Sequence, residues 1–109
     1  MVRVKVRWER GQITRLEVTG HAGFAPRGED IVCAAVSTLA QTAVVGLREV
    51  AGVVPEVTVR EGNLSCEIPR LAGDALEKSQ VIMKTVLLGF RGIEKAHPEY
   101  VKVLEQEAV

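Results

Sequence analysis

Residues 2–8 alternate strictly between apolar and charged side chains, and this alternation limits the fold more than any other feature of the sequence. Valine or tryptophan stands at positions 2, 4, 6 and 8, with arginine or lysine between them. A period of two predicts a β-strand with one buried face and one solvated face. After a turn at Gly11, Leu16 and Val18 continue the pattern, whereas Ile13 is out of step with them. We therefore predict a β-hairpin over residues 2–19, with a bulge near Thr14.

From residue 31 onward the apolar spacing changes to that of a helix. Asp30 precedes an almost uncharged run that continues to about Gly52, and aspartate is a preferred N-cap residue. Because this helix carries few charges, we expect it to be buried at the centre of the fold. Residues 57–68 then predict a second hairpin, with its turn at residues 61–63.

A second, amphipathic helix follows this hairpin. We expect Asp74 to cap it, and we expect it to end before His97, because the residue before Pro98 disfavours the helical region. Residues 100–104 form a short last strand. The prediction is an α+β fold in two layers. Its mostly antiparallel sheet is built from two hairpins plus the last strand, packed with the central helix and the second amphipathic helix.

Length and composition narrow the choice of function. A chain of 109 residues predicts one domain over residues 1–109. A formal net charge of zero and an aromatic content of 4% disfavour a strongly basic nucleic-acid binder. Two cysteines are too few for a disulfide framework, and neither histidine lies four residues from another histidine or a cysteine, so we expect no metal site. The charged first strand is unlike a signal peptide, and no stretch reaches 18 uncharged apolar residues. We therefore expect a cytoplasmic protein without a membrane span.

The segment 20–33 combines one of the two histidines with one of the two cysteines. His21 follows the predicted second strand, and Cys33 lies in the first turn of the predicted helix, where backbone N–H groups have no intrahelical partner. A helix N-terminus and a nearby imidazole both stabilise a thiolate. The pattern favours a catalytic pair, with Cys33 as nucleophile and His21 as general base and later general acid. The N–H groups of the helix start would hold the oxyanion.

Each of these residues also has a structural interpretation. A cysteine on an apolar helix usually packs in the core and a histidine after a glycine usually lies in a loop, so the two interpretations are evenly balanced. Asp30 is expected to cap the helix and can also orient the histidine or contact substrate. Ser37, one turn after the cysteine, either bonds near the site or bonds back to its own helix. Cys66 is expected to be buried in a strand, and His97 to act at a helix end.

The motifs GHAG at residues 20–23 and GEDIVCAAVS at residues 28–37 resemble the signature of the Prp family of bacterial ribosomal-processing cysteine proteases. The likeness extends over essentially the whole chain. It implies a cysteine endopeptidase that removes the N-terminal extension of a large-subunit ribosomal protein by cutting after an aromatic residue. It assigns the nucleophile to Cys33, the catalytic histidine to His21, and supporting positions to Asp30 and Ser37. Members form homodimers and use no cofactor, and no direct contact with nucleic acid is required.

The same resemblance implies a mobile, glycine-rich loop at residues 22–29 that orders around the substrate. We expect the following positions to contribute to this substrate loop: Gly20, Gly23, Phe24, Pro26 and Gly28. Phe24 and Pro26 are the candidates for part of the pocket that takes the aromatic side chain.

The sequence alone is compatible with two other functions. The row Arg3, Lys5 and Arg7 suits a non-catalytic ribosome- or RNA-associated binding module, whose affinity would fall steeply with salt. A reactive Cys33 would also suit a peroxide or thiol sensor, which needs a resolving cysteine. We rank both below the protease.

Overall fold

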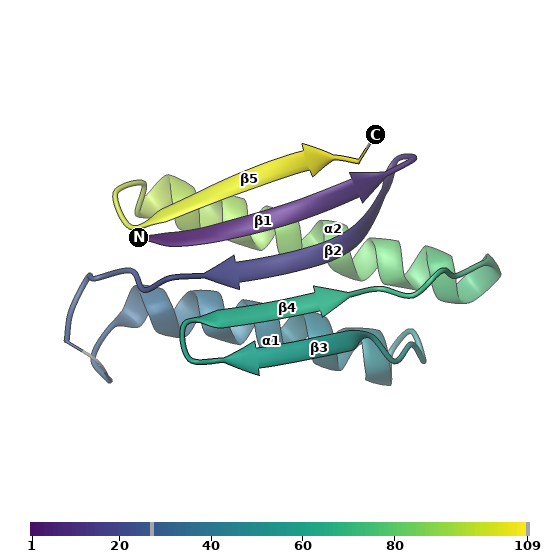
Figure 1. Ribbon diagram of the computed structural model, residues 1–109, viewed down its shortest axis with the longest axis horizontal. Helices are drawn as coiled ribbons and strands as arrows, with labels where there is room; N and C mark the ends of the chain where they lie inside the picture. Colours follow the sequence, from purple (N-terminus) through teal and green to yellow (C-terminus); the bar gives the residue numbers. More distant parts are fainter. Residues whose placement is uncertain (27, 109) are drawn as a thin grey trace.

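The computed structural model describes residues 1–26 and 28–108, and its elements follow the predicted order (Figure 1). The elements are β1 (Val2–Glu9), β2 (Gln12–Thr19), α1 (Ile31–Glu49), β3 (Glu56–Arg60), β4 (Asn63–Glu67), α2 (Gly73–Ala96) and β5 (Val101–Glu107). This arrangement confirms the predicted α+β fold.

The strands form a five-stranded sheet in the order β3-β4-β2-β1-β5. Each neighbouring pair is antiparallel except β1 and β5, which are parallel because α2 crosses between β4 and β5. Both helices lie on one face of the sheet, so its other face is uncovered (Figure 1). The fold therefore has the two layers expected from the alternating strands and the two apolar helices.

The alternation in β1 determines which side chains enter the core. Val2, Val4 and Val6 are at most 2% exposed and belong to the central cluster, while Arg3 and Arg7 are exposed. Phe90 of α2 is the largest fully buried side chain of this cluster. Burying a side chain of this kind contributes about 1.5–3 kcal/mol to stability. A slip of one residue in the strand pairing would expose the valines and lose this energy, so burial fixes the register of β1.

The predicted bulge lies at Thr14. Arg7 pairs with Arg15 and Trp8 pairs with Ile13, which leaves Thr14 as the extra residue of β2. The bulge brings Ile13 into the core with 1% of its surface exposed. The buried amide of Gln80 from α2 satisfies the Ile13 backbone: its Oε1 accepts from Ile13 N at 2.7 Å and its Nε2 donates to Ile13 O at 2.9 Å.

Replacing Gln80 with leucine should destabilise the protein strongly. Gln80→Leu leaves the N–H and C=O of Ile13 buried without partners, and each such group costs about 1–3 kcal/mol. We expect a loss of about 2–4 kcal/mol in the free energy of unfolding, measured by urea denaturation. The control is Gln106→Leu on the exposed side of β5, which should cost no more than about 0.5 kcal/mol. Equal losses in the two variants would show that the amide does not hold the bulge.

Helix α2 begins differently from the prediction. Its N-cap is Ala72, which makes no side-chain capping bond, and Asp74 lies inside the first turn. Asp74 is therefore not the cap; it forms an ion pair with Lys78 at 2.9 Å. An acidic residue is favoured anywhere in a first turn by the helix dipole, so its presence does not set the first residue of the helix. The other end is as predicted, because α2 ends at Ala96, before His97 and Pro98.

Strand β5 is longer than the predicted 100–104, because its pairing with β1 continues to Glu107. Its outer edge is bound by α2: Glu94 Oε2 accepts from Val103 N at 2.7 Å. Glu105 accepts from Trp8 Nε1 at 3.0 Å and also pairs with Arg91 of α2. These long-range bonds extend the strand beyond its apolar residues.

Helix α1 is long and apolar enough to cross a membrane by length and composition alone. The sequence-based expectation of no such stretch was therefore too strict. One face of the helix packs on the sheet through its buried residues, which are Val32, Val36, Ala40, Ala43, Val44 and Leu47. These residues make up only a third of its most apolar stretch, so α1 is not the fully buried central helix that the sequence predicted: its outer face is exposed.

Candidate active site

The start of α1 is built around the Asp30 side chain. Asp30 has an extended backbone, and its Oδ1 accepts hydrogen bonds from Val32 N at 3.0 Å and Cys33 N at 2.9 Å. The predicted N-cap is therefore present, and it fixes Cys33 in the first helical turn. The backbone hydrogen bond from Cys33 is the main reason that the pKa of the Asp30 carboxyl lies below its ordinary value.

The second carboxylate oxygen of Asp30 binds the loop that precedes the helix. Its Oδ2 accepts from Phe24 N at 3.0 Å. The Phe24 ring packs edge-on against His97 and Tyr100, with ring centroids 5.7 and 5.3 Å apart. The loop is thus attached to the start of α1 at one point and to the junction of α2 and β5 at another.

The thiol of Cys33 receives a backbone donor from that loop. Ala22 N donates to Cys33 Sγ at 3.2 Å, and the thiol side chain is partly buried. The sequence predicted that N–H groups at the helix start would hold an oxyanion, but Asp30 already occupies those of Val32 and Cys33. The N–H that lies at the sulfur is that of Ala22, a group that no residue pattern indicates.

His21 and Cys33 lie on the wall of one pocket of about 360 Å³. The pocket is formed between α1, the ends of β1 and β2, and the β3–β4 hairpin; its remaining lining residues are Val2, Val18, Gly20, Val36, Ser37, Ala40, Gln41, Val59, Arg60, Gly62, Asn63 and Leu64. His21 is exposed and follows β2 by two residues. The structure therefore brings the two predicted catalytic residues to one pocket, although no hydrogen bond joins their side chains among the described residues.

Of the other predicted site residues, some line this pocket and some do not. Ser37 lines the pocket, where its exposed Oγ accepts from Gln41 Nε2 at 3.0 Å. Gly20 lines it too. The other loop positions named from the sequence, Gly23, Phe24, Pro26 and Gly28, are not among the described residues that line it. The β3–β4 hairpin was missed as a wall of the site, because only long-range strand pairing brings it there.

The second cysteine has no place in this chemistry. Cys66 is 0% exposed in β4, and burial raises the pKa of its thiol to about 11. It is buried as the sequence predicted, and the two cysteines are free thiols. Among residues 1–26 and 28–108 there is also no group of three or more histidine, cysteine or acidic side chains that would hold a metal ion.

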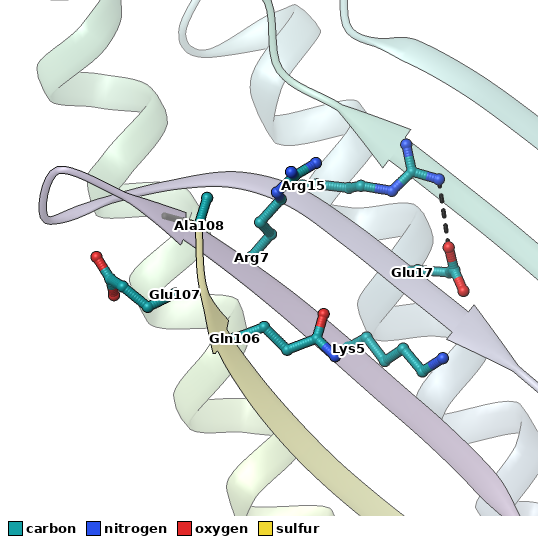
Figure 2. Close-up of a pocket in the computed structure, with 7 residues that line it drawn as sticks. All are labelled: Lys5, Arg7, Arg15, Glu17, Gln106, Glu107 and Ala108. Atoms are coloured by element: carbon teal, nitrogen blue, oxygen red, sulfur yellow. Dashed lines mark hydrogen bonds and ion pairs between the residues drawn. The ribbon is translucent and has the colours of Figure 1, made fainter.

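The uncovered face of the sheet carries a separate hollow of about 430 Å³ (Figure 2). It lies over β1, β2 and β5 and is lined by Lys5, Arg7, Arg15, Glu17, Gln106, Glu107 and Ala108. Its charges are mixed: Arg15 pairs with Glu17 at 3.2 Å, and Arg7 lies 3.9 Å from Glu9. Among the described residues no cysteine, serine or histidine lines it, so the nucleophile and base expected from the sequence are not found there.

Removing the Asp30 carboxylate should loosen both the helix start and the loop. For Asp30→Ala we expect a lower midpoint of urea unfolding, since Cys33 and the Phe24 backbone lose a common partner. For the peptide cleavage that the family resemblance implies, we expect a rate about tenfold lower. The matched control is Asp74→Ala, which removes a first-turn acid that does not cap. It should change neither quantity appreciably.

The stability that Asp30 contributes should also depend on pH. Because the pKa of Asp30 is lowered in the folded protein from 3.8, its contribution is present above that value and is lost as the pH falls through the lower folded value. The difference in unfolding midpoint between wild type and Asp30→Ala should therefore shrink when urea titrations are moved from pH 7 to below pH 3.8. A difference independent of pH would contradict the capping role.

Three comparisons relate this chain to known proteins. The sequence profile of a family described as "Cysteine protease Prp" matches residues 1–102. The chain is 32% identical over 94 residues to the ribosomal processing cysteine protease Prp of Bacillus subtilis, covering 84% of each protein. It superposes on the crystal structure of SMU.848 from Streptococcus mutans with a TM-score of 0.87 at 30% identity, covering 99% of this chain and 96% of that one.

A structure of the essential ribosomal processing protease Prp from S. aureus, in complex with a covalently linked product peptide, is also similar. Its TM-score is 0.88 at 22% identity, and the alignment covers 97% of this chain and 100% of that one. At this identity the likeness concerns the fold, and it extends over the sheet and both helices described above.

Proposed function

Since the chain belongs to the Prp family of cysteine proteases, we propose that it removes the N-terminal extension of a large-subunit ribosomal protein by cutting after an aromatic residue. The observation that carries the assignment of the site is the shared pocket of Cys33 and His21, with the Ala22 N–H directed at the sulfur. A partly buried thiol and an imidazole are the nucleophile and base that acyl transfer by a thiol requires, and the bond from Ala22 N orients the sulfur.

The proposed reaction proceeds in two halves. The proton of the Cys33 thiol passes to His21, and the sulfur attacks the carbonyl carbon that follows the aromatic side chain, forming a C–S bond. The C–N bond then breaks as His21 returns the proton to the leaving amine. Water, deprotonated by His21, attacks the thioester and releases the carboxylate product and the free thiol. These steps use side chains and water, so the proposal includes neither a cofactor nor a nucleic acid.

The wall of the pocket supports an apolar side chain next to the scissile bond. Val36 and Ala40 of α1 and Val59 and Leu64 of the β3–β4 hairpin line it together with Cys33. Mostly apolar walls with a few polar groups are typical of sites that bind such side chains. An aromatic residue of the substrate would lose water there while its backbone carbonyl stays at the sulfur.

The test is a mass-spectrometric cleavage assay with the N-terminal peptide of the host's own ribosomal protein. We expect one cut, after the aromatic residue, and none in a peptide whose aromatic residue is replaced by alanine. Cutting elsewhere would refute the specificity. If neither peptide is cut, a salt-dependent RNA titration will test the binding-module alternative, in which affinity falls steeply as salt rises.

We also propose that the protein acts as a cytoplasmic homodimer. Both cysteines are free thiols, which suits a reducing compartment. The helix layer carries several exposed apolar side chains, namely Ile31, Val45, Val81 and Leu88, each more than half exposed. Such side chains favour an interface between two copies. Light scattering should give the dimer mass for the wild type and a monomer for Leu88→Lys; a wild-type monomer would refute this proposal.

A further inference from the structure

The turn between β3 and β4 lies directly against His21. The β2–β4 pairing ends with Thr19 opposite Asn63, and Gly20 N then donates to Gly62 O at 2.9 Å. This bond comes one residue before His21, so the chain that carries the imidazole is attached to the hairpin turn. The attachment fixes the backbone from which the side chain extends.

Gly62 leaves the space that the imidazole occupies. A Cβ atom built at position 62 would lie 3.1 Å from His21 Nε2, 3.6 Å from Cε1 and 3.7 Å from Cδ2. The first of these distances is shorter than an ordinary contact, and the atom concerned belongs to a rigid ring. A side chain at this position would therefore require the imidazole or the turn to shift by a few tenths of an ångström.

We propose that Gly62 is a positioning residue for His21: because it has no side chain, the imidazole can pack against the hairpin turn in the pocket that Cys33 also lines. The proposal rests on the proposed function, in which His21 moves the proton of the thiol. Acid–base catalysis depends on the placement of the ring, and a displacement of about 1 Å can cost about 100-fold in rate. The hairpin is thereby part of the catalytic apparatus although it supplies no reacting group.

Gly62 also has a positive φ of 70°, which by itself favours glycine in a two-residue hairpin turn. The chain contains a matched position that separates the two explanations. Gly11, in the turn between β1 and β2, has a φ of 76° and would place a Cβ atom in open space. An alanine causes the same kind of backbone strain at both positions, but only at position 62 does it meet His21.

The experiment compares Gly62→Ala with Gly11→Ala in the full chain. We expect similar shifts in the midpoint of urea unfolding for both. Only Gly62→Ala should lower kcat, by about tenfold or more, with KM changed less than about twofold and with an altered pH profile of kcat. Only Gly62→Ala should also move the ¹H–¹³C NMR signal of the His21 ring. Equal kcat values in the two variants, or an unmoved His21 signal, would overturn the proposal.

Two provisions keep this test decisive. If an alanine variant fails to fold, Gly62→Asn and Gly11→Asn replace the pair, because asparagine adopts positive φ more readily and still carries a Cβ atom. If the wild-type protein cuts no ribosomal-protein peptide, the proposed function fails, but the NMR signal still tests whether Gly62 positions the His21 ring. In that case a His21 signal that moves with Gly62→Ala and not with Gly11→Ala supports this positioning, and an unmoved signal refutes it.

Discussion

Cys33→Ala should abolish cleavage of the ribosomal-protein peptide, with a fall in kcat of at least about 10⁴-fold. The variant has no sulfur to attack the carbonyl, and no described side chain of the pocket replaces it: Ser37 is the nearest hydroxyl along the helix, one turn away and bonded to Gln41. The fold should be intact, because the capping bonds from the backbone N–H groups of Val32 and Cys33 to Asp30 do not depend on the thiol. Cleavage by mass spectrometry and far-UV circular dichroism measure the two expectations.

Cys66→Ala is the matched control for this prediction. Cys66 is fully buried in β4, and the raised pKa of its thiol keeps it protonated near neutral pH. Its replacement should lower stability and leave kcat within about twofold. In the folded wild type, iodoacetamide at pH 8 should label Cys33 and spare Cys66 until urea unfolds the protein. Residual cutting by Cys33→Ala, or loss of cutting in Cys66→Ala, would overturn the choice of nucleophile.

Local patterns were sufficient to predict most of the fold. Alternation placed Val2, Val4 and Val6 in the core, and the misplaced Ile13 indicated the bulge at Thr14. Both signals come from residues that are neighbours in the chain, and burial of one face forces the register. The prediction that Asp74 caps α2 was wrong, because the helix dipole favours an acidic residue at several positions of the first turn.

The candidate site was predictable only where its residues are close in sequence. His21, Asp30 and Cys33 lie within 13 positions of one another, and the structure brings all three to the start of α1 or to its pocket. The hairpin wall and the packing of His21 against Gly62 depend on the pairing of β2 with β4, which joins residues more than 40 positions apart. No single stretch of sequence indicates that pairing, so the prediction of the site did not include the β3–β4 hairpin.

His21→Ala should reduce kcat by about 10²–10⁴-fold, the usual contribution of general acid–base catalysis. The effect should be smaller than that of Cys33→Ala, because the thiol and its hydrogen bond from Ala22 N remain. His97→Ala is the matched control: His97 ends α2 and contacts the Phe24 ring, but it does not line the pocket among the described residues. Its replacement should change kcat by no more than about threefold.

The pH dependence separates a catalytic His21 from one that only shapes the loop. A general base gives the wild type a rise in kcat/KM on the acidic side of the profile, and that rise should disappear in His21→Ala and persist in His97→Ala. Kinetics on the ribosomal-protein peptide across the pH range provide the measurement. If His21→Ala kept the acidic rise, the base would be another group, and the pocket would need a different proton acceptor for Cys33.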